Sequence, residues 1–147
     1  MKKRPSVGIV VILKNKNKLL LGKRLVKHGF GEWGLIGGRL ELGESFKECA
    51  IRETKEETGI KLSRPKPVQI TNVIYSKDNH SVALFYLAET NKEPKNPEPN
   101  KLEEWKWFEW NKLPTPLFLP VKKLKKSGLL KKIFSNKKLS DSQINVY

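Results

Sequence analysis

Hydrophobic residues in the first part of the chain fall into short runs separated by polar or glycine-rich stretches. Residues 6–13 (SVGIVVIL) are apolar and β-branched, a pattern typical of a buried strand. A polar turn at 14–17 follows, and residues 18–24 (KLLLGKR) are predicted to form the second strand of a hairpin. Glycines punctuate a loop at 26–34, and a short strand is expected at 35–36.

The pattern of short apolar runs returns after two prolines, Pro65 and Pro67, that mark a loop. Two antiparallel strands are predicted at 68–76 and 81–89, joined by residues 77–80. A second loop, rich in proline and asparagine, occupies residues 91–100. The alternating run WKWFEW at 105–110 predicts one more strand.

Helical signals occur in two places. Ser45 is a favourable N-cap, Glu48 completes a capping box, and Gly59 is a suitable stop, so a helix is expected over 46–58. Residues 117–127 predict a second helix, with lysines on one side and four apolar residues on the other: Leu117, Phe118, Val121 and Leu124. Strands, a helix, more strands and a helix predict one α+β domain over residues 1–134, followed by a loose tail at 135–147.

The first predicted helix carries several glutamates that helix formation does not require. Glu53, Glu56 and Glu57 are spaced i, i+3 and i+4, which places three carboxylates on one face. Like charges at this spacing repel by roughly 0.2–0.5 kcal/mol per pair. A bound cation would remove that cost, and carboxylate oxygens suit Mg²⁺ or Mn²⁺. Arg52, four residues before Glu56, is placed to hold a carboxylate in a fixed orientation.

Length and composition limit the number of domains and the kinds of partner that the chain can have. The chain has 147 residues, enough for one domain with a real core, and its formal net charge is +15. That charge favours polyanions such as nucleotides, nucleic acid or anionic lipid, although a lysine-rich, well-solvated surface explains it equally. Cys49 is the one cysteine, so no internal disulfide forms, and it is expected to pack as a small apolar residue. No apolar run approaches the length of a membrane span, and a cytoplasmic location is expected.

The acidic helix and its flanks resemble a known motif. Gly38, Glu44 and the run 52–60 (RETKEETGI) are separated by five and seven residues. This stretch resembles the Nudix box at seven fixed identities with the required spacing. Two neighbouring positions depart from the pattern: Thr54 replaces a larger aliphatic residue, and Ile36 stands where many members have a proline.

The resemblance implies a Nudix fold, a mixed β-sheet between α-helices, over most of residues 6–127. It also implies a metal site built from Gly37, Glu53, Glu56, Glu57 and an acid from a later loop. Glu98 is the candidate for that acid, with Glu103 and Glu104 as rivals. Glu53 would polarise the attacking water, Arg52 would orient the acids, and Glu44 would support them or help as a base.

Several segments resemble the MutT-like branch of the family, which cleaves nucleoside triphosphates to monophosphate and pyrophosphate. Arg24 or Lys23 would then clamp the phosphates, and Gly38 would let the backbone approach the ligand closely. A base could stack on Trp33, Phe30 or His28, although a core role for Trp33 fits as well.

The sequence argues against some other substrate classes and leaves others possible. Four zinc-binding cysteines and an aromatic-proline motif would mark a dinucleotide-NADH branch, and neither is present. ADP-ribose enzymes tend to have a proline where Ser76 stands, and dinucleoside-polyphosphate enzymes a tyrosine near Tyr75. The basic run 122–138 would suit RNA 5′ ends. A non-catalytic nucleotide-binding module is disfavoured because all the box acids are present, and a homodimer would be in keeping with the branch.

Overall fold

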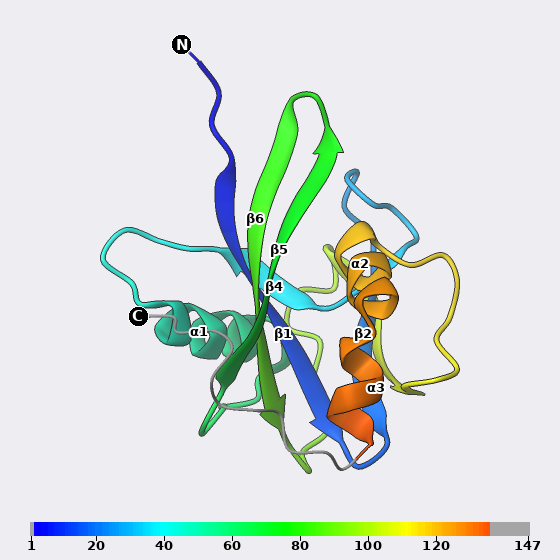
Figure 1. Ribbon diagram of the computed structural model, residues 1–147. Coiled ribbons are helices and arrows are strands. Elements are labelled where there is room, and N and C mark those ends of the chain that lie inside the picture. The colour runs from blue at the N-terminus through cyan, green and yellow to red at the C-terminus, as the bar shows by residue number, and fades with distance from the viewer. Residues whose placement is uncertain (1, 136–147) are drawn as a thin grey trace.

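The computed structural model describes residues 2–135 and contains a mixed sheet with helices on both faces (Figure 1). In chain order the elements are β1 (Ser6–Asn15), β2 (Lys18–Arg24), β3 (Trp33–Gly34), β4 (Ile36–Arg39), α1 (Phe46–Thr58), β5 (Lys66–Ser76), β6 (Asn79–Glu89), β7 (Leu102–Glu109), α2 (Leu119–Ser127) and α3 (Leu129–Phe134). The α+β class predicted from the order of elements is confirmed.

Strand β1 is the centre of the seven-stranded sheet. It pairs in parallel with β6 along nine residues and antiparallel with β4 through Gly8–Val11. Only its last two residues pair with β2, which then diverges to pair with β3 and β7. The order β3-β2-β1-β6-β5, with β4 beside β1, therefore brings the two glycines of β4 next to the middle of the sheet.

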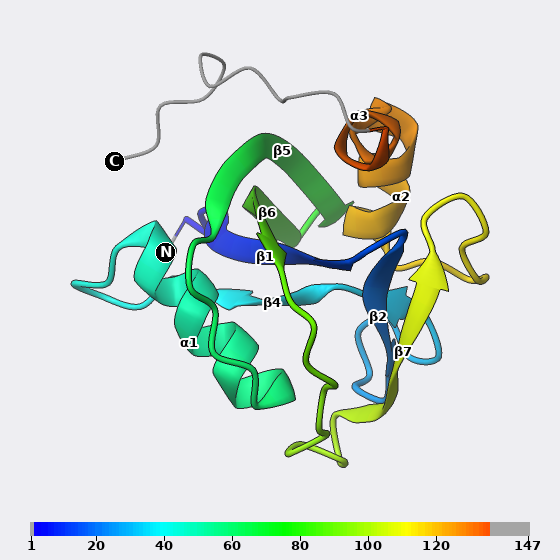
Figure 2. The same ribbon diagram turned by 90° about the horizontal axis from the view of Figure 1, so that it is seen from below.

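Alternation along β1 divides the interior into two cores. Ile9, Val11 and Leu13 point to the side covered by α1, where they pack with Cys49 and Ala50. On the opposite side Ile12 joins a second cluster that includes five apolar residues of α2 and α3: Val121, Leu124, Leu129, Leu130 and Ile133. Figure 2 shows α1 on one side of the sheet and α2 with α3 on the other. Burial of Cys49 confirms its predicted packing role.

Helix α1 begins and ends where its caps predict. Ser45 Oγ accepts a hydrogen bond from the Glu48 backbone N–H at 3.0 Å, and Gly59 adopts the left-handed conformation with φ 75°. The departure at Thr54 is accommodated inside the helix, because its buried hydroxyl donates to the Ala50 carbonyl at 2.8 Å. This hydrogen bond satisfies the buried hydroxyl of Thr54, a polar group that the usual aliphatic residue at this position lacks.

Several predicted boundaries are wrong. Strand β1 ends two residues later than predicted, at Asn15, and β6 starts two residues earlier, at Asn79. The short strand at 35–36 is in fact two strands, β3 and β4, and β4 contains both Gly37 and Gly38. Strand β5 starts at Lys66 and includes Pro67, which is tolerated because β5 is an edge strand. Strand β7 starts at Leu102, three residues early.

The helix expected at 117–127 starts at Leu119, and Gly128, with φ 79°, separates it from a second short helix. Within the described residues, no helix has the length and apolar character needed to cross a membrane. The predicted loose tail lies outside the described residues, apart from Ser135.

Candidate active site

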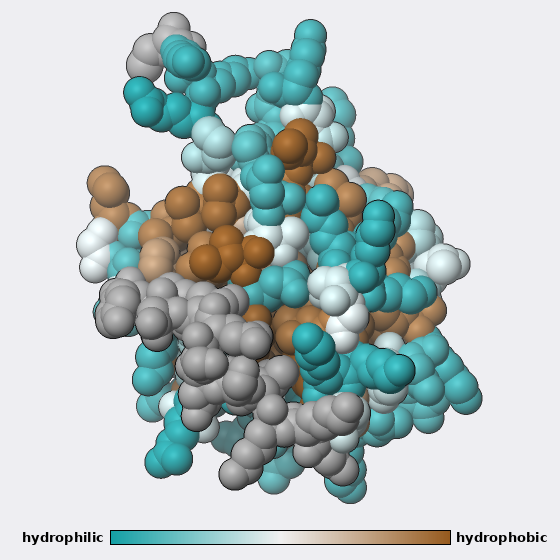
Figure 3. Space-filling model, viewed as in Figure 1, coloured by the Kyte–Doolittle hydropathy of each residue, from teal (hydrophilic) through white to brown (hydrophobic). Residues whose placement is uncertain are grey.

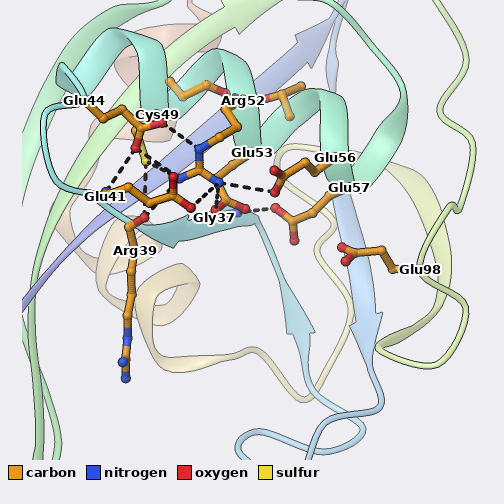
Figure 4. Close-up of polar contacts among 12 residues, drawn as sticks. Gly37, Arg39, Glu41, Glu44, Cys49, Arg52, Glu53, Glu56, Glu57 and Glu98 are labelled. Carbon is orange, nitrogen blue, oxygen red and sulfur yellow. Dashed lines mark hydrogen bonds and ion pairs between the residues drawn. The ribbon is translucent and has the colours of Figure 1, made fainter.

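Three glutamates of α1 face the paired glycines of β4 across a shared cleft. Glu53, Glu56 and Glu57 line this cleft together with Gly37 and Gly38. Its remaining walls come from β2, the loop before β7 and the start of β7, and its volume is about 670 Å³. Figure 4 shows Glu53 and Glu56 directed at the Arg52 guanidinium and Glu57 directed at Gly37. The structure therefore brings together the acids of the box and the glycines that precede it.

Arg52 holds several of these carboxylates at once. Its Nε lies 2.6 Å from Glu44 Oε2, and its Nη1 lies 2.7 Å from Glu53 Oε1 and 3.2 Å from Glu56 Oε2 (Figure 4). Its Nη2 donates to Glu44 Oε1 and to the Arg39 carbonyl, both at 3.1 Å. A planar guanidinium with five donors can hold three carboxylates and a carbonyl in fixed directions, which a lysine cannot.

Glu44 is fixed by this network away from the cleft. Hydrogen bonds from Arg52, and one from the Glu41 backbone N–H, lower the pKa of Glu44 to about 2. Its carboxylate does not line the cleft. The geometry therefore fits the expected supporting role of Glu44 and leaves it poorly placed to act as a base.

Glu57 is the most deeply placed of the acids. Its Oε2 accepts a hydrogen bond from the Gly37 backbone N–H at 3.0 Å. Burial, reinforced by the nearby charge of Glu53, raises the pKa of Glu57 to about 8. The Trp105 indole N–H donates to the Glu57 carbonyl at 2.8 Å and so fastens the end of α1 to β7.

Glu53 depends on the absence of a side chain at position 38. A Cβ on Gly38 would lie 2.1 Å from Glu53 Oε1, so the carboxylate occupies the space that a glycine leaves open. Burial raises the pKa of Glu53, while the hydrogen bond from Arg52 acts in the opposite direction.

The loop before β7 contributes Glu98 to the cleft. Glu98 lines it, and its Oε2 lies 3.1 Å from Lys101 Nζ. Its two rivals do not line the cleft, and Glu103 instead pairs with Lys23 at 3.3 Å. Asn96 closes the base of this loop by donating to the Leu102 carbonyl at 2.7 Å. Position therefore favours Glu98 as the later acid.

A second, smaller cavity of about 260 Å³ adjoins the acidic cleft. Five residues line both spaces: Arg24, Gly37, Gly38, Arg39 and Glu57. Its aromatic wall consists of His28, Tyr75 and Phe118, whose rings pack on one another at centroid distances of 4.5–5.5 Å. Polar side chains also line it, including Ser6, Asn79 and Ser81.

Arg24 stands at the junction of the two spaces. Its guanidinium lies 3.8 Å from the centroid of the Phe118 ring and donates to the His28 carbonyl from Nε and Nη2. Burial lowers the pKa of Arg24, and the nearby Glu57 carboxylate acts in the opposite direction. The predicted phosphate clamp is thus placed where a ligand could reach it from both sides.

Three predicted ligand contacts are not brought to the site. Trp33 lines neither space and packs its ring edge-on against Phe108 at 5.0 Å, in the second core. Lys23 also lines neither space, because it pairs with Glu103 on the surface. Phe30 is 68% exposed and lines neither space.

Sequence reasoning missed several lining residues. Arg39 and Lys101 line the cleft, and Tyr75 and Phe118 line the cavity. The position of Arg39 directly after the paired glycines was a usable signal. The positions of Tyr75 and Phe118 were not, because they meet only through the packing of α2 against β5.

The donor set fits a divalent cation, although the side chains are not drawn together. Within residues 2–135, no three acidic, histidine or cysteine side chains converge closely enough to hold a metal ion. Arg52 holds Glu53 and Glu56, and the Gly37 N–H holds Glu57. All three acids share one helix face, so side-chain rotation alone could gather hard oxygen ligands beside the glycines. The space that Gly38 leaves for Glu53 supports this fit.

Comparison with known proteins settles the family. The sequence profile of the NUDIX domain matches residues 2–127. The chain therefore belongs to the Nudix family. This membership confirms the resemblance of its box, and the fold agrees with it.

A solved MutT NUDIX hydrolase from Burkholderia pseudomallei is similar to this Nudix domain along nearly its whole length. It superimposes with a TM-score of 0.80 at 32% identity, covering 84% of this chain and 98% of that one.

Two groups of curated relatives differ in the substrate that their names state. NAD-capped RNA hydrolase NudC of Vibrio atlanticus is 32% identical over 111 residues, which are 72% of this chain and 38% of that protein. ADP-ribose pyrophosphatase of Methanocaldococcus jannaschii is 34% identical over 89 residues, 58% of this chain and 51% of that protein. The Nudix domain described here thus spans about two fifths to one half of the length of these relatives.

Relatives are named as hydrolases or pyrophosphatases, and hydrolases of this family generally use divalent metal ions. The prediction that this chain is a Nudix hydrolase is supported at that level, and a choice among substrates is not. In particular, the sequence argument against a dinucleotide branch does not separate this chain from relatives that act on NAD-capped RNA.

Proposed function

We propose that this chain is a Mg²⁺-dependent pyrophosphohydrolase that cleaves a nucleoside triphosphate to a nucleoside monophosphate and pyrophosphate. One observation supports this most directly. The acidic cleft and the aromatic cavity share a wall of five residues, so a single ligand can place its phosphates beside the glutamates and its base beside the aromatic rings.

Glu53, Glu56 and Glu57 would hold the metal, with the Gly37 carbonyl and Glu98 completing its ligands. A bound Mg²⁺, or Mn²⁺, would neutralise phosphate charge and lower the pKa of a water molecule. The deep placement of Glu57 fits such a role, because a cation offsets the burial that otherwise raises the pKa of its carboxylate.

Glu53 is the residue that would activate the attacking water. Arg52 fixes one of its oxygens at 2.7 Å and so orients the carboxylate, while burial raises the pKa of the Glu53 carboxyl, which favours proton transfer near neutral pH. The oxygen of the attacking water bonds to the α-phosphorus, and a proton of this water passes to Glu53. The bond between the α-phosphorus and the oxygen that bridges it to the β-phosphorus then breaks. Pyrophosphate leaves with the bonding electron pair. Arg24 and Arg39 are placed to balance phosphate charge during this step.

The size of the cavity favours one nucleoside over two. At about 260 Å³ it lies below the usual range of roughly 300–1,000 Å³ for pockets that enclose drug-sized ligands. His28, Tyr75 and Phe118 would contact the base, and Asn79 would hydrogen-bond to its edge. The end-to-end similarity to a MutT NUDIX hydrolase supports the same choice.

A nucleotide at an RNA 5′ end is the second candidate. The NAD-capped RNA hydrolase relatives favour it, and one terminal nucleoside would fit the same cavity. ADP-ribose and dinucleoside polyphosphates would place a second group outside the cavity. A binding module without activity is disfavoured by the complete acidic set.

The test is a substrate panel with product identification in the presence of Mg²⁺. The panel holds nucleoside triphosphates, NDP-sugars, ADP-ribose, dinucleoside polyphosphates, and triphosphorylated and NAD-capped RNA. The proposal expects nucleoside triphosphates to give the highest kcat/KM and to release pyrophosphate. It also expects Glu53→Gln to lose at least about a hundredfold in kcat.

Glu48→Gln is the matched control, since Glu48 is an exposed acid on the same helix. It should keep the activity of the parent chain. Full turnover by Glu53→Gln would overturn the mechanism, and a clear preference for another class in the panel would overturn the substrate.

A further inference from the structure

Helices α2 and α3 present a face made almost entirely of lysine. Six lysines lie on these two short helices: Lys122, Lys123, Lys125, Lys126, Lys131 and Lys132. Five of them are exposed and Lys123 is half-buried. We call this group the lysine face. Figure 3 shows hydrophilic side chains projecting from the region that α2 and α3 occupy in Figure 1.

This surface belongs to one of two long acid-free basic stretches of the chain; the other, residues 1–31, carries nine basic residues. The 25 residues from Asn111 to Ser135 carry seven lysines and no acidic residue. Fourteen of the fifteen acidic residues of the chain precede this segment. Within the described residues, no lysine of the lysine face forms an ion pair.

The clustered lysines repel one another within α2. Lys122 is three residues from Lys125 and four from Lys126, so the three ammonium groups share one face of α2. Each such like-charged pair destabilises a helix by roughly 0.2–0.5 kcal/mol. Four of the lysines lie in the last turns of the two helices, where they complement the helix dipole, but neither helix has an acid in its first turn. An anionic partner would remove this repulsion.

The partner is recognised by charge and not by apolar contact. The apolar sides of both helices are already buried in the second core, through residues such as Val121, Leu124 and Ile133. A helix that binds a membrane surface presents an apolar face to the acyl chains, and none is left here. A row of exposed ammonium groups without exposed aromatics instead suits a repeating phosphate backbone read without regard to base.

The lysine face begins at the rim of the nucleoside cavity. Phe118 and Pro120 line that cavity, and the first lysine follows two residues after Pro120. A polymer bound along α2 and α3 would therefore run from the neighbourhood of the cavity across the outer surface of the molecule. The basic run predicted at 122–138 also includes Lys137 and Lys138, which lie outside the described residues.

We propose that the lysine face on α2 and α3 is a binding surface for the phosphodiester backbone of a nucleic acid. Binding is independent of sequence and falls steeply with salt. The lysine face is separate from the acidic cleft, so this proposal does not depend on whether the chain hydrolyses free nucleotides.

The experiment measures fluorescence anisotropy of a labelled single-stranded RNA over a series of KCl concentrations. The test variant is Lys122→Gln/Lys125→Gln/Lys126→Gln. The matched control is Lys47→Gln/Lys77→Gln/Lys92→Gln, which removes the same charge from three scattered, exposed lysines. Each lost phosphate contact lowers the slope of log K against log salt by roughly 0.7, so the test variant should lose about 2 from that slope. Its affinity should fall at least tenfold, while the control stays close to the parent.

Two further readouts separate this proposal from a folding defect and from the proposed function. The test variant should melt at the parent temperature or above, because like-charge repulsion is relieved. Its turnover of a free nucleoside triphosphate should be unchanged, because these lysines touch neither the cleft nor the cavity.

Single-stranded DNA of the same sequence, duplex DNA and vesicles of phosphatidylserine and phosphatidylcholine complete the comparison. Binding of any of the nucleic acids with loss specific to the test variant supports the proposal, and their ranking identifies the source of the backbone. Equal loss in the two triple variants, absence of nucleic-acid binding, or binding of the vesicles alone overturns it.

Discussion

A single guanidinium organises the acids of this site. Arg52 contacts Glu44, Glu53 and Glu56, so it converts three repelling charges into an oriented set. The contact with Glu44 is the shortest of the three, and Glu44 does not line the cleft. Glu44 therefore holds Arg52 in position. The orientation of Glu53 thus depends on a residue nine positions earlier in the chain.

The Glu44–Arg52 contact should appear in the pH dependence of stability. The folded pKa of Glu44, about 2, lies below its ordinary value of 4.5. Its contribution is therefore fully present above pH 4.5 and is lost as the pH falls toward 2. We expect Glu44→Gln to lower the unfolding free energy by on the order of 1–3 kcal/mol at neutral pH.

Urea unfolding of both proteins from neutral pH to pH 3 measures this difference. It should shrink as the medium becomes acidic, because the parent carboxylate then takes up its proton. A difference that stays constant over the whole range would show that the loss is one of packing and not of charge.

At the scale of single residues, sequence reasoning predicted that Glu53, Glu56, Glu57 and Glu98 lie near the paired glycines, and all four line the same cleft. Their roles in metal binding and catalysis stay predictions. The three acids of α1 could be grouped in advance because helical spacing determines which side chains share a face, whereas Glu98 was chosen by its loop alone. Sequence reasoning could not choose between Arg24 and Lys23 as the residue that binds phosphate. Neighbouring strand residues point to opposite faces of the sheet, and the sequence did not show which face of β2 lines the cleft. Trp33 illustrates the same limit, since an aromatic residue in a loop serves a core or a ligand equally well.

At the scale of elements, α1 is determined by its own caps. Ser45 and Gly59 terminate it, and Cys49 and Ala50 bury its first turns against β1 and β4. Its bounds could therefore be predicted to the residue. The bounds of β3, β4 and β7 could not, because these strands end where their pairing partners end and not where a local signal stands.

Loss of the N-cap should weaken α1 without touching the cleft. Ser45→Ala removes the acceptor for the Glu48 N–H, and we expect a loss of about 1 kcal/mol in unfolding free energy. Ser45→Asp keeps an acceptor at this position and should stay close to the parent. Chemical denaturation followed by circular dichroism measures both variants, and equal stability of Ser45→Ala and the parent would argue against a role for this cap.

At the scale of the whole molecule, the two sides of the sheet have different tasks. The side under α1 carries the acids, and the side under α2 and α3 carries the lysine face, with β1 and β4 between them (Figure 2). The acidic cleft lies beside β4, next to the central strand of the sheet, while the six lysines of the lysine face lie on the opposite layer. The Nudix box accounts for the first arrangement, and the lysines of α2 and α3 account for the second.

The central claim is that the acids of α1 gather around a divalent cation beside Gly37 and Gly38. Titration of the substrate-free protein with Mn²⁺, followed by calorimetry, tests it most directly because turnover is not involved. The account predicts that the parent and Glu48→Gln bind Mn²⁺ alike, and that Glu57→Gln binds it at least tenfold more weakly. Equal Mn²⁺ affinity in Glu57→Gln and the parent, or no binding by either, would contradict the account.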